Sequence, residues 1–354
     1  MKNIYLDFLE NENHGSGLVI ATVTESLGST PQKPGSSALF DSDRLISGTV
    51  GGGMVEGQVQ EFAQRSSLSK KSGYLHFSLN KDVSNKYEAI CGGKTSVLVD
   101  ANPLMHLSVF KAIRQSISEN IPGVLITMVT VIRETQVLIN RYWMTAESKP
   151  SMPVEFMEKI EPEVKSMLES TGREDYRKLV LSIPGEEPSS LFFLELLLPA
   201  EKLVIAGAGH IGKAVAHLGK MIDFEVTVID DRQEYANTQN LPEADHIIFR
   251  DIGEAMNEIE KDRKTYIVIV TRGHANDAEA LKSCIGSDAA YIGMIGSRAK
   301  TAKVHKDFID KKWATEEQWS RIYTPIGLEI ASKTVEEIAV SIAAQLILVR
   351  NRNK

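Results

Sequence analysis

Residues 203–212 read LVIAGAGHIG, an apolar run followed by a glycine-rich turn. The spacing of Gly207, Gly209 and Gly212 fits the GxGxxG pattern, which joins the first strand of a dinucleotide-binding unit to the helix after it. Gly207 allows the tight turn, Gly209 lets a pyrophosphate approach the backbone, and Gly212 lets helix and strand pack closely. The free N–H groups at the helix N-terminus attract phosphate. We therefore expect a phosphate-bearing, nucleotide-like cofactor at this loop.

The strand after this helix ends at Asp230, 18 residues beyond the third glycine. A carboxylate at that point accepts hydrogen bonds from ribose hydroxyls, so Asp230 favours a ribose with a free 2′-hydroxyl, a preference that Arg232 weakens slightly. His210 lies inside the loop and either faces the bound phosphate or caps the helix. The alternative for the whole segment is a unit of the same topology whose loop binds nothing.

The chain from residue 202 onward alternates short apolar runs with helical or loop segments. The runs cover residues 203–206, 225–229, 245–249, 266–270 and 290–294. Continuous apolar strands of this kind are buried on both faces, which is typical of a parallel sheet. We therefore expect residues 200–354 to form a Rossmann-like, doubly wound parallel-sheet domain. Its last helix carries an apolar stripe that packs against either the body of the chain or a second copy.

The segment after the strand that ends at Val270 carries polar side chains. Ligands in doubly wound sheets lie beyond the carboxyl ends of the strands, so His274 and Asp277 are predicted to face the cofactor. The alternative is that Asn276 or Asp277 caps the next helix and that His274 is a surface residue.

A glycine turn follows the last of the five runs. Gly296 is followed by Ser297 and Arg298, whose side chains donate hydrogen bonds, and the turn therefore resembles a second seat for a phosphate or carboxylate. The alternative is a plain glycine turn with a solvated arginine.

The first part of the chain shows a different order of elements. Helical patterns cover residues 54–65, 104–118 and 154–169, and a short apolar-faced helix opens the chain. Strand-like runs cover residues 18–23, 37–40, 95–99, 124–131, 136–143, 178–183 and 191–198. This order predicts an N-terminal α+β domain over residues 1–199, and the chain as a whole is of the α/β class.

Two loops of this first domain are candidates for binding. Gly51, Gly52 and Gly53 come just before a helix and form either an anion-binding nest or a flexible hairpin turn. Cys91 stands before two glycines, which permit close backbone approach and leave the thiol accessible. Cys284 lies in an apolar-faced helix and is expected to be a buried structural thiol.

Composition narrows the possible classes of function. The chain has 354 residues, and its formal charge of −7 is spread over interleaved acidic and basic residues, so no basic stripe indicates a nucleic-acid partner. No apolar run approaches the ~18 residues of a membrane span, and the first residues lack the pattern of a signal peptide. Two distant cysteines indicate neither a disulfide framework nor a zinc site. The cytoplasm is the expected compartment.

Six motifs, taken in order over nearly the whole chain, resemble those of xanthine dehydrogenase accessory factors, the XdhC/CoxI family. They are Gly28-Ser29-Thr30-Pro31 with Pro34-Gly35, Gly51-Gly52-Gly53-Met54-Val55-Glu56, Cys91-Gly92-Gly93, Gly207-Ala208-Gly209-His210-Ile211-Gly212, Gly293-Met294-Ile295-Gly296-Ser297-Arg298 and Pro325-Ile326-Gly327-Leu328-Glu329-Ile330. The resemblance implies a chaperone that binds the molybdenum cofactor, as molybdopterin or its dinucleotide form, supports its sulfuration and delivers it to apo-xanthine dehydrogenase or a related molybdenum hydroxylase. It also implies a cysteine desulfurase as a partner and a homodimer.

The resemblance also assigns roles in the first domain. It implies that Cys91 contacts molybdenum or sulfur, for which a thiolate is a suitable soft ligand, and that Gly51, Gly52 and Gly53 belong to the cofactor site. Glu56 matches the motif and hydrogen-bonds either the pterin or the loop. Met54 stands where the family commonly has a cysteine, which puts in doubt any step that needs a thiol at that position.

Two other functions remain open on the sequence. An NAD-dependent oxidoreductase would use His274 and Asp277 as a proton relay and Asp230 on the ribose, but it leaves Cys91 and the first domain's loops without a task. A nucleotide-sensing regulatory module would shift a dimer interface through the last helix.

Overall fold

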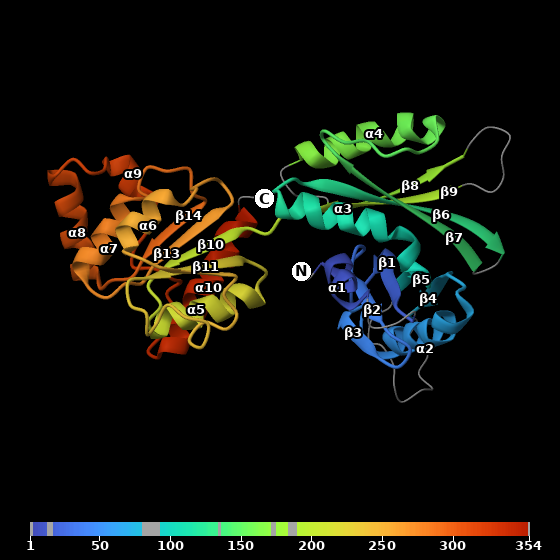
Figure 1. The fold of residues 1–354 in the computed structure, drawn as a ribbon, viewed down its shortest axis with the longest axis horizontal. Helices are drawn as coiled ribbons and strands as arrows, with labels where there is room; N and C mark the ends of the chain where they lie inside the picture. The colour runs from blue at the N-terminus through green and yellow to red at the C-terminus, as the bar shows by residue number, and fades with distance from the viewer. Residues whose placement is uncertain are drawn as a thin grey trace. The chain divides into compact units, whose positions relative to one another are not determined.

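The computed structural model describes residues 3–12, 17–79, 93–133, 136–170, 175–182 and 190–352. The chain divides into two compact units, an N-terminal unit (Lys2–Pro199) and a C-terminal unit (Ala200–Lys354), shown in Figure 1. Each unit has hydrophobic clusters of its own. No helix in these described ranges is long and apolar enough to cross a membrane.

The N-terminal unit is built on a nine-stranded sheet of order β3-β2-β1-β5-β4-β7-β6-β9-β8, in which neighbouring strands run antiparallel. The strands are β1 (Val19–Gly28), β2 (Ser37–Phe40), β3 (Leu45–Gly48), β4 (Gly73–Ser78), β5 (Gly93–Asp100), β6 (Gly123–Arg133), β7 (Gln136–Thr145), β8 (Tyr176–Leu181) and β9 (Ser190–Leu197). Among the described residues, β4 meets β7 at one residue pair, Gly73 with Gln136. The sheet therefore has a five-stranded and a four-stranded part with a short junction between them.

Helices cover this sheet through apolar stripes. They are α1 (Ile4–Asn11), α2 (Gly53–Ser69), a 3₁₀ turn (Pro103–His106), α3 (Leu107–Ser118) and α4 (Val154–Glu169). In α4 the buried residues Phe156, Ile160, Val164 and Met167 recur every three or four positions, so one face packs against β6 and β9. In the same way α2 packs against β1, β2 and β5. The predicted α+β class is confirmed.

The C-terminal unit is built on a six-stranded parallel sheet of order β12-β11-β10-β13-β14-β15. The strands are β10 (Lys202–Ala206), β11 (Glu225–Asp230), β12 (His246–Phe249), β13 (Thr265–Ile269), β14 (Tyr291–Met294) and β15 (Ile322–Tyr323). Numbered along the chain, the six strands lie in the order 3-2-1-4-5-6, which is the strand order of a Rossmann unit. All of them run parallel, and the order in which they are added changes direction between β10 and β13. The predicted doubly wound parallel sheet is confirmed. In sheets of this order ligands bind beyond the edge where, here, β10 and β13 end.

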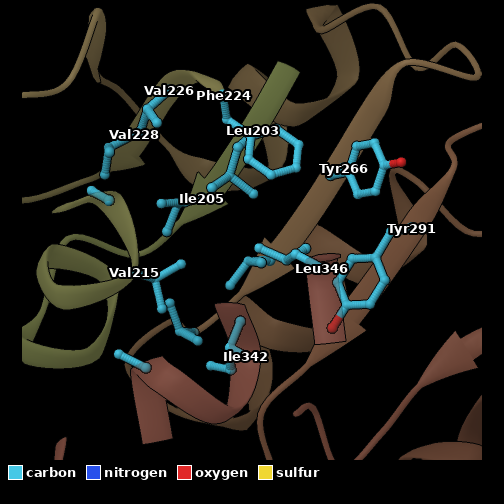
Figure 2. Packing of buried hydrophobic residues seen from close by; sticks show 14 of the residues in the cluster. Leu203, Ile205, Val215, Phe224, Val226, Val228, Tyr266, Tyr291, Ile342 and Leu346 are labelled. Carbon is cyan, nitrogen blue, oxygen red and sulfur yellow. The ribbon is translucent and has the colours of Figure 1, made fainter. Parts of the chain in front are cut away.

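Helices lie on both faces of the parallel sheet. They are α5 (His210–Met221), α6 (Ile252–Glu258), α7 (His274–Lys282), α8 (Arg298–Asp310), α9 (Glu316–Ser320) and α10 (Val335–Arg352). On one face Ile342 and Leu346 of α10 join Val215 of α5 in a cluster with Leu203 and Ile205 of β10 (Figure 2). The other face is covered by α6, α7 and α8. The apolar stripe of the last helix therefore packs against the body of its own unit.

Candidate cofactor site

The glycine loop of the C-terminal unit joins β10 to α5. Gly207 has φ +113°, and a Cβ atom there would lie 2.5 Å from the carbonyl oxygen of Val270. A Cβ atom on Gly212 would lie 1.8 Å from the carbonyl oxygen of Gly207, whereas no atom outside the immediate chain lies within 4 Å of a Cβ on Gly209. Two of the glycines are thus required by packing, and the third leaves open space at the start of α5.

The first turn of α5 follows directly from this loop. Its N-cap is Gly209, which offers no side-chain hydrogen bond, and His210 is the first helical residue and is exposed. Backbone N–H groups at an uncapped helix start suit an anion. His210 lies next to this helix start, where a bound anion would be. The N-cap is Gly209, so His210 does not cap the helix.

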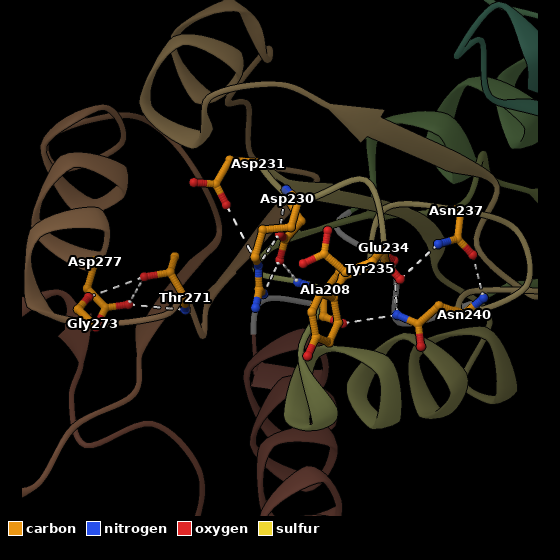
Figure 3. A network of polar contacts seen from close by, with 11 residues as sticks. Ala208, Asp230, Asp231, Glu234, Tyr235, Asn237, Asn240, Thr271, Gly273 and Asp277 are labelled. Carbon is orange, nitrogen blue, oxygen red and sulfur yellow. Dashed lines mark hydrogen bonds and ion pairs between the residues drawn. The ribbon is translucent and has the colours of Figure 1, made fainter.

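The carboxylate of Asp230 closes the loop from the end of β11. Its Oδ2 accepts from the Ala208 N–H at 2.7 Å and from Nη2 of Arg232 at 2.8 Å, and its Oδ1 accepts from the N–H and Nε of Arg232 at 3.0 and 2.8 Å (Figure 3). Burial raises the pKa of Asp230, but these hydrogen bonds outweigh burial and lower it. Both oxygens are therefore engaged, and a ribose hydroxyl would have to displace a donor.

Arg232 is held on its other side by an aromatic ring. Its guanidinium lies 3.9 Å from the ring centroid of Tyr235. Asn240 then ties this segment to the glycine loop, because its side-chain amide donates to the carbonyl oxygens of Ala208 at 3.1 Å and Tyr235 at 2.9 Å. The sequence pattern does not mark Tyr235 and Asn240, because their contacts join segments that no motif connects.

Asp277 ties the segment after β13 to α8. Its Oδ1 accepts from the N–H and hydroxyl of Thr271 at 3.1 and 2.6 Å, and its Oδ2 pairs with Nζ of Lys300. The Asp277 side chain is fully buried. The N-cap of α7 is Gly273, with φ +96°, so neither Asn276 nor Asp277 caps this helix. Both oxygens of the Asp277 carboxylate are thus engaged, one by the loop and one by Lys300. The side chain of His274 lies outside the described part.

The turn after β14 begins α8. Ser297 is the N-cap, and its hydroxyl accepts from the Lys300 N–H at 3.2 Å. Arg298 is 90% exposed, with its Nη2 3.9 Å from Oε2 of Glu329. Gly296 precedes the cap, and a Cβ atom there would lie 3.1 Å from the Lys300 side chain. Arg298 is therefore solvated, as in the alternative of a plain glycine turn. The start of α8 beside it is already capped by the Ser297 side chain.

In the N-terminal unit, three described glycines from different segments, Gly28, Gly51 and Gly93, lie around the loop that follows β1. Gly28 pairs with Gly93 across β1 and β5, and a Cβ atom on Gly93 would lie 2.6 Å from the carbonyl oxygens of Leu27 and Ser29. A Cβ atom on Gly51 would lie 2.8 Å from Cγ of Pro31. The loop after β1 thus contacts both the loop before α2 and the start of β5.

The loop before α2 has the backbone of a glycine-specific turn. The φ values of Gly51, Gly52 and Gly53 are +128°, +64° and +55°, and no neighbouring atom lies within 4 Å of a Cβ on either Gly52 or Gly53. Glu56 accepts from the Thr49 hydroxyl at 2.7 Å, and its partner is therefore the loop. Met54, in the position of the family's cysteine, is 47% exposed.

Cys91 and Gly92 lie outside the described residues, and the predicted metal contact of Cys91 stays a prediction. Within the described ranges, no group of three or more His, Cys, Asp or Glu side chains could hold a metal ion. Cys284 is buried, as expected, and burial raises the pKa of its thiol to about 12. A thiol of that pKa stays protonated at neutral pH, which fits a structural role.

The parallel sheet of order 3-2-1-4-5-6, with a glycine loop where the strand order changes direction, defines a Rossmann-type unit in the same chain as an antiparallel α+β unit. Two family models match the chain in the same order. The XdhC and CoxI family matches residues 13–78, and the XdhC Rossmann domain matches residues 203–346, which together exceed half of the chain. The chain belongs to the XdhC and CoxI family.

Several known proteins are similar to the chain over most of its length. An uncharacterized protein of Escherichia coli K12, YqeB, is 21% identical to the chain over 350 residues. The match covers 99% of this chain and 46% of YqeB, so the chain spans about half the length of YqeB. A Bacillus subtilis 168 protein, named as a probable subunit of xanthine dehydrogenase, is 24% identical over 340 residues, covering 94% of this chain and 93% of that one. A crystal structure described as a xanthine dehydrogenase from Bacillus halodurans shares the fold, with a TM-score of 0.75, 23% identity and coverage of 99% and 96%.

Proposed function

We propose that the chain is an accessory protein that binds the molybdenum cofactor, supports its sulfuration and delivers it to xanthine dehydrogenase or a related molybdenum hydroxylase. Its family and its relative in Bacillus subtilis support an accessory role for xanthine dehydrogenase. The observation that carries the proposal is that the loop after β1 contacts both the glycine-rich loop before α2 and Gly93 at the start of β5, in a unit separate from the Rossmann unit. A nucleotide-dependent dehydrogenase has no need of that second set of loops.

The residues present suit the phosphate of such a cofactor. A molybdenum pterin carries a phosphate, or a pyrophosphate in its dinucleotide form, and supplies the redox centre of the client enzyme. The open space beside Gly209 and the uncapped start of α5 would hold a phosphate. Gly52 and Gly53 leave similar space at the start of α2. In this proposal Cys91 supplies a thiolate, the soft ligand that molybdenum or a transferred sulfur needs.

The competing function is an NAD-dependent oxidoreductase. It requires Asp277 in a proton relay and Asp230 on the ribose. The carboxylate of Asp277 is occupied by Thr271 and Lys300, and both oxygens of Asp230 accept from donors of the protein. Each acid would first have to release a partner, at a cost of about 1–3 kcal/mol for a buried hydrogen bond. This cost favours a carrier over a dehydrogenase.

The test is to incubate the full chain with molybdenum cofactor, NAD and NADH in parallel. Retained molybdenum is measured by mass spectrometry, the pterin by its fluorescence after oxidation, and the nicotinamide by calorimetry. The proposal expects molybdenum and pterin to be retained together. Tight NADH binding without pterin retention would overturn it.

Two substitutions locate the cofactor, each with a matched control. Gly209→Val is expected to abolish retention, because its side chain fills the space beside the loop, whereas Gly57→Ala, at an exposed position of α2 with open space around it, leaves retention unchanged. Cys91→Ala is expected to reduce retained molybdenum or sulfur, whereas Cys284→Ala, at the buried thiol, is not. Equal retention by both cysteine variants would make Cys91 structural.

The proposed partners are tested with the same protein. A cysteine desulfurase is expected to raise the sulfur carried per molybdenum, and apo-xanthine dehydrogenase is expected to gain activity only when the loaded chain is added. Light scattering tests the proposed homodimer. Equal activation of the apo-enzyme by free cofactor at the same concentration would remove the delivery step from the proposal.

A further inference from the structure

A cavity of about 700 Å³ lies in the N-terminal unit, at the end of α2 opposite the glycine loop. Its walls come from the last turns of α2, the connection to β4, and the two strands β6 and β7. This volume lies within the roughly 300–1,000 Å³ of small-molecule sites. We call it the cationic cavity, after Arg65, Lys71 and Arg133, which line it. It belongs to neither the glycine loops nor the Rossmann unit.

The charges that line the cationic cavity are of one sign. Arg65, Lys71 and Arg133 come from three different segments, and no carboxylate is among the described lining residues. Arg65 is partly balanced by Glu61 on the same helix, with Nη2 3.3 Å from the carboxylate. The side chains of Lys71 and Arg133 have no hydrogen-bond or ion-pair partner within the described ranges. Three cations line one cavity, and the one carboxylate paired with them is exposed, so the cavity favours the binding of an anionic ligand.

The helix dipole explains only part of this arrangement. The C-terminal end of α2 carries a partial negative charge, which attracts a cation such as Lys71. Arg133 is not part of that end, because it closes β6, more than sixty residues further along the chain. The fold brings it to the same wall as Arg65. The gathering of charge is therefore a property of the tertiary structure.

The remaining walls suit a polyoxyanion attached to an apolar or aromatic group. Three serine hydroxyls and the Gln136 amide add hydrogen-bond donors to the cations. Phe62 supplies an apolar wall, and its ring packs directly on Gly73, where a Cβ atom would lie 2.3 Å from it. Arginine matches phosphate oxygens bidentately, while lysine adds a point charge.

We propose that the cationic cavity binds a phosphorylated small molecule, with its phosphate between Arg65, Lys71 and Arg133 and its organic part against Phe62. The site lies where the two parts of the sheet meet, at the Gly73–Gln136 pair. A ligand there contacts α2, the connection between α2 and β4, and the strands β6 and β7, so its binding also ties the two parts of the sheet together. This site is independent of the proposed cofactor function.

The test uses the full chain and sodium pyrophosphate as the probe, at constant ionic strength, with calorimetry and a thermal melt. The double variant K71Q/R133Q is expected to weaken binding at this site at least tenfold. The matched control is K111Q/R114Q, which removes two exposed cations of α3 outside the cavity. Both double variants lose the same charge, and exposed side chains of this kind leave folding intact, as the melts without probe verify.

Location is read by amide hydrogen exchange. We expect pyrophosphate to protect residues 69–79 and 136–145 in the native chain and in the control, but not in K71Q/R133Q. The proposal is overturned by any of four results: no pyrophosphate binding, unchanged binding by K71Q/R133Q, an equal loss in both double variants, or tighter binding of an oligoglutamate peptide than of pyrophosphate. The last result would assign the cavity to an acidic protein segment. None of them bears on retention of the molybdenum cofactor.

Discussion

Arg232 forms a bidentate ion pair with Asp230, with Nε donating to Oδ1 and Nη2 to Oδ2 at 2.8 Å each. In dinucleotide-binding units a carboxylate at this position takes the ribose hydroxyls. Here the Ala208 N–H and Arg232 already occupy the carboxylate. A nucleotide bound along the glycine loop would therefore meet a guanidinium before it meets the acid.

Removal of the Arg232 side chain should open Asp230 to a ribose. We expect Arg232→Ala to raise the affinity for 5′-AMP and NADH about tenfold, because one charged hydrogen bond contributes about 1.5–3 kcal/mol. Calorimetry measures this, and Arg250→Ala, at an exposed pair with Glu258, is the control. Weaker nucleotide binding by Arg232→Ala would instead show that the guanidinium itself contacts the ligand.

The glycines of the loop should separate stability from binding. We expect Gly212→Ala to destabilise the C-terminal unit by about 3 kcal/mol or more, because its Cβ would lie 1.8 Å from a carbonyl oxygen. Gly209→Ala should change stability by less than about 0.5 kcal/mol, since its Cβ meets open space and its φ is −67°. Urea unfolding followed by circular dichroism measures both. A large loss of stability in Gly209→Ala would contradict the open space that the structure shows beside Gly209.

The buried pair of Asp277 and Lys300 should be sensitive to the loss of one partner. We expect Lys300→Met to cost about 3–5 kcal/mol of unfolding free energy, because it leaves a fully buried carboxylate uncompensated. Arg250→Met at the exposed pair with Glu258 should cost less than about 1 kcal/mol. The double variant D277N/K300M should recover part of the loss. A cost equal to that of the exposed pair would mean that Asp277 is not held by Lys300.

Glu195 should make stability fall as pH rises towards neutrality. Burial raises the pKa of Glu195 to about 7, against the hydrogen bond that the Tyr5 hydroxyl donates to it at 2.7 Å. Between pH 4.5, the ordinary pKa of a glutamate, and pH 7, the folded chain therefore binds more protons at this site than the unfolded chain. The stability contributed by the protonated carboxyl is full at low pH and is lost through this window, by on the order of 2 kcal/mol.

Chemical unfolding at pH 5, 6, 7 and 8 measures that loss. We expect Glu195→Gln to flatten the curve between pH 5 and 7, because its neutral amide does not titrate. Glu161→Gln, at an exposed pair with Lys149, is the control. If the unfolding free energy of Glu195→Gln fell with pH as steeply as that of the native chain, the pH dependence would belong to other groups.

Much of the fold could be predicted from local pattern. The predicted helix over 154–169 coincides with α4, and the predicted strand over 37–40 coincides with β2. The strands β3 and β4 were missed. β3 is nowhere fully buried and shows no alternation of buried and exposed positions. β4 alternates half-buried and exposed positions over its last four residues, a signal that Leu75 and Phe77 give in the sequence.

The sequence by itself determined the turn at Gly207, where φ is +113°, the close packing of Gly212 on Gly207 and the helix that follows, because the spacing of the glycines within one short segment marks all three. Only the tertiary structure decided which donors reach the two carboxylates: Arg232 hydrogen-bonds Asp230, and Lys300 hydrogen-bonds Asp277. It also decided that Gly28 lies beside Gly93. Whether a carboxylate is free depends on donors that come from other segments, and spacing along the chain does not encode them. The glycine loop is thus a local property, whereas the availability of the acids around it is a property of the folded chain.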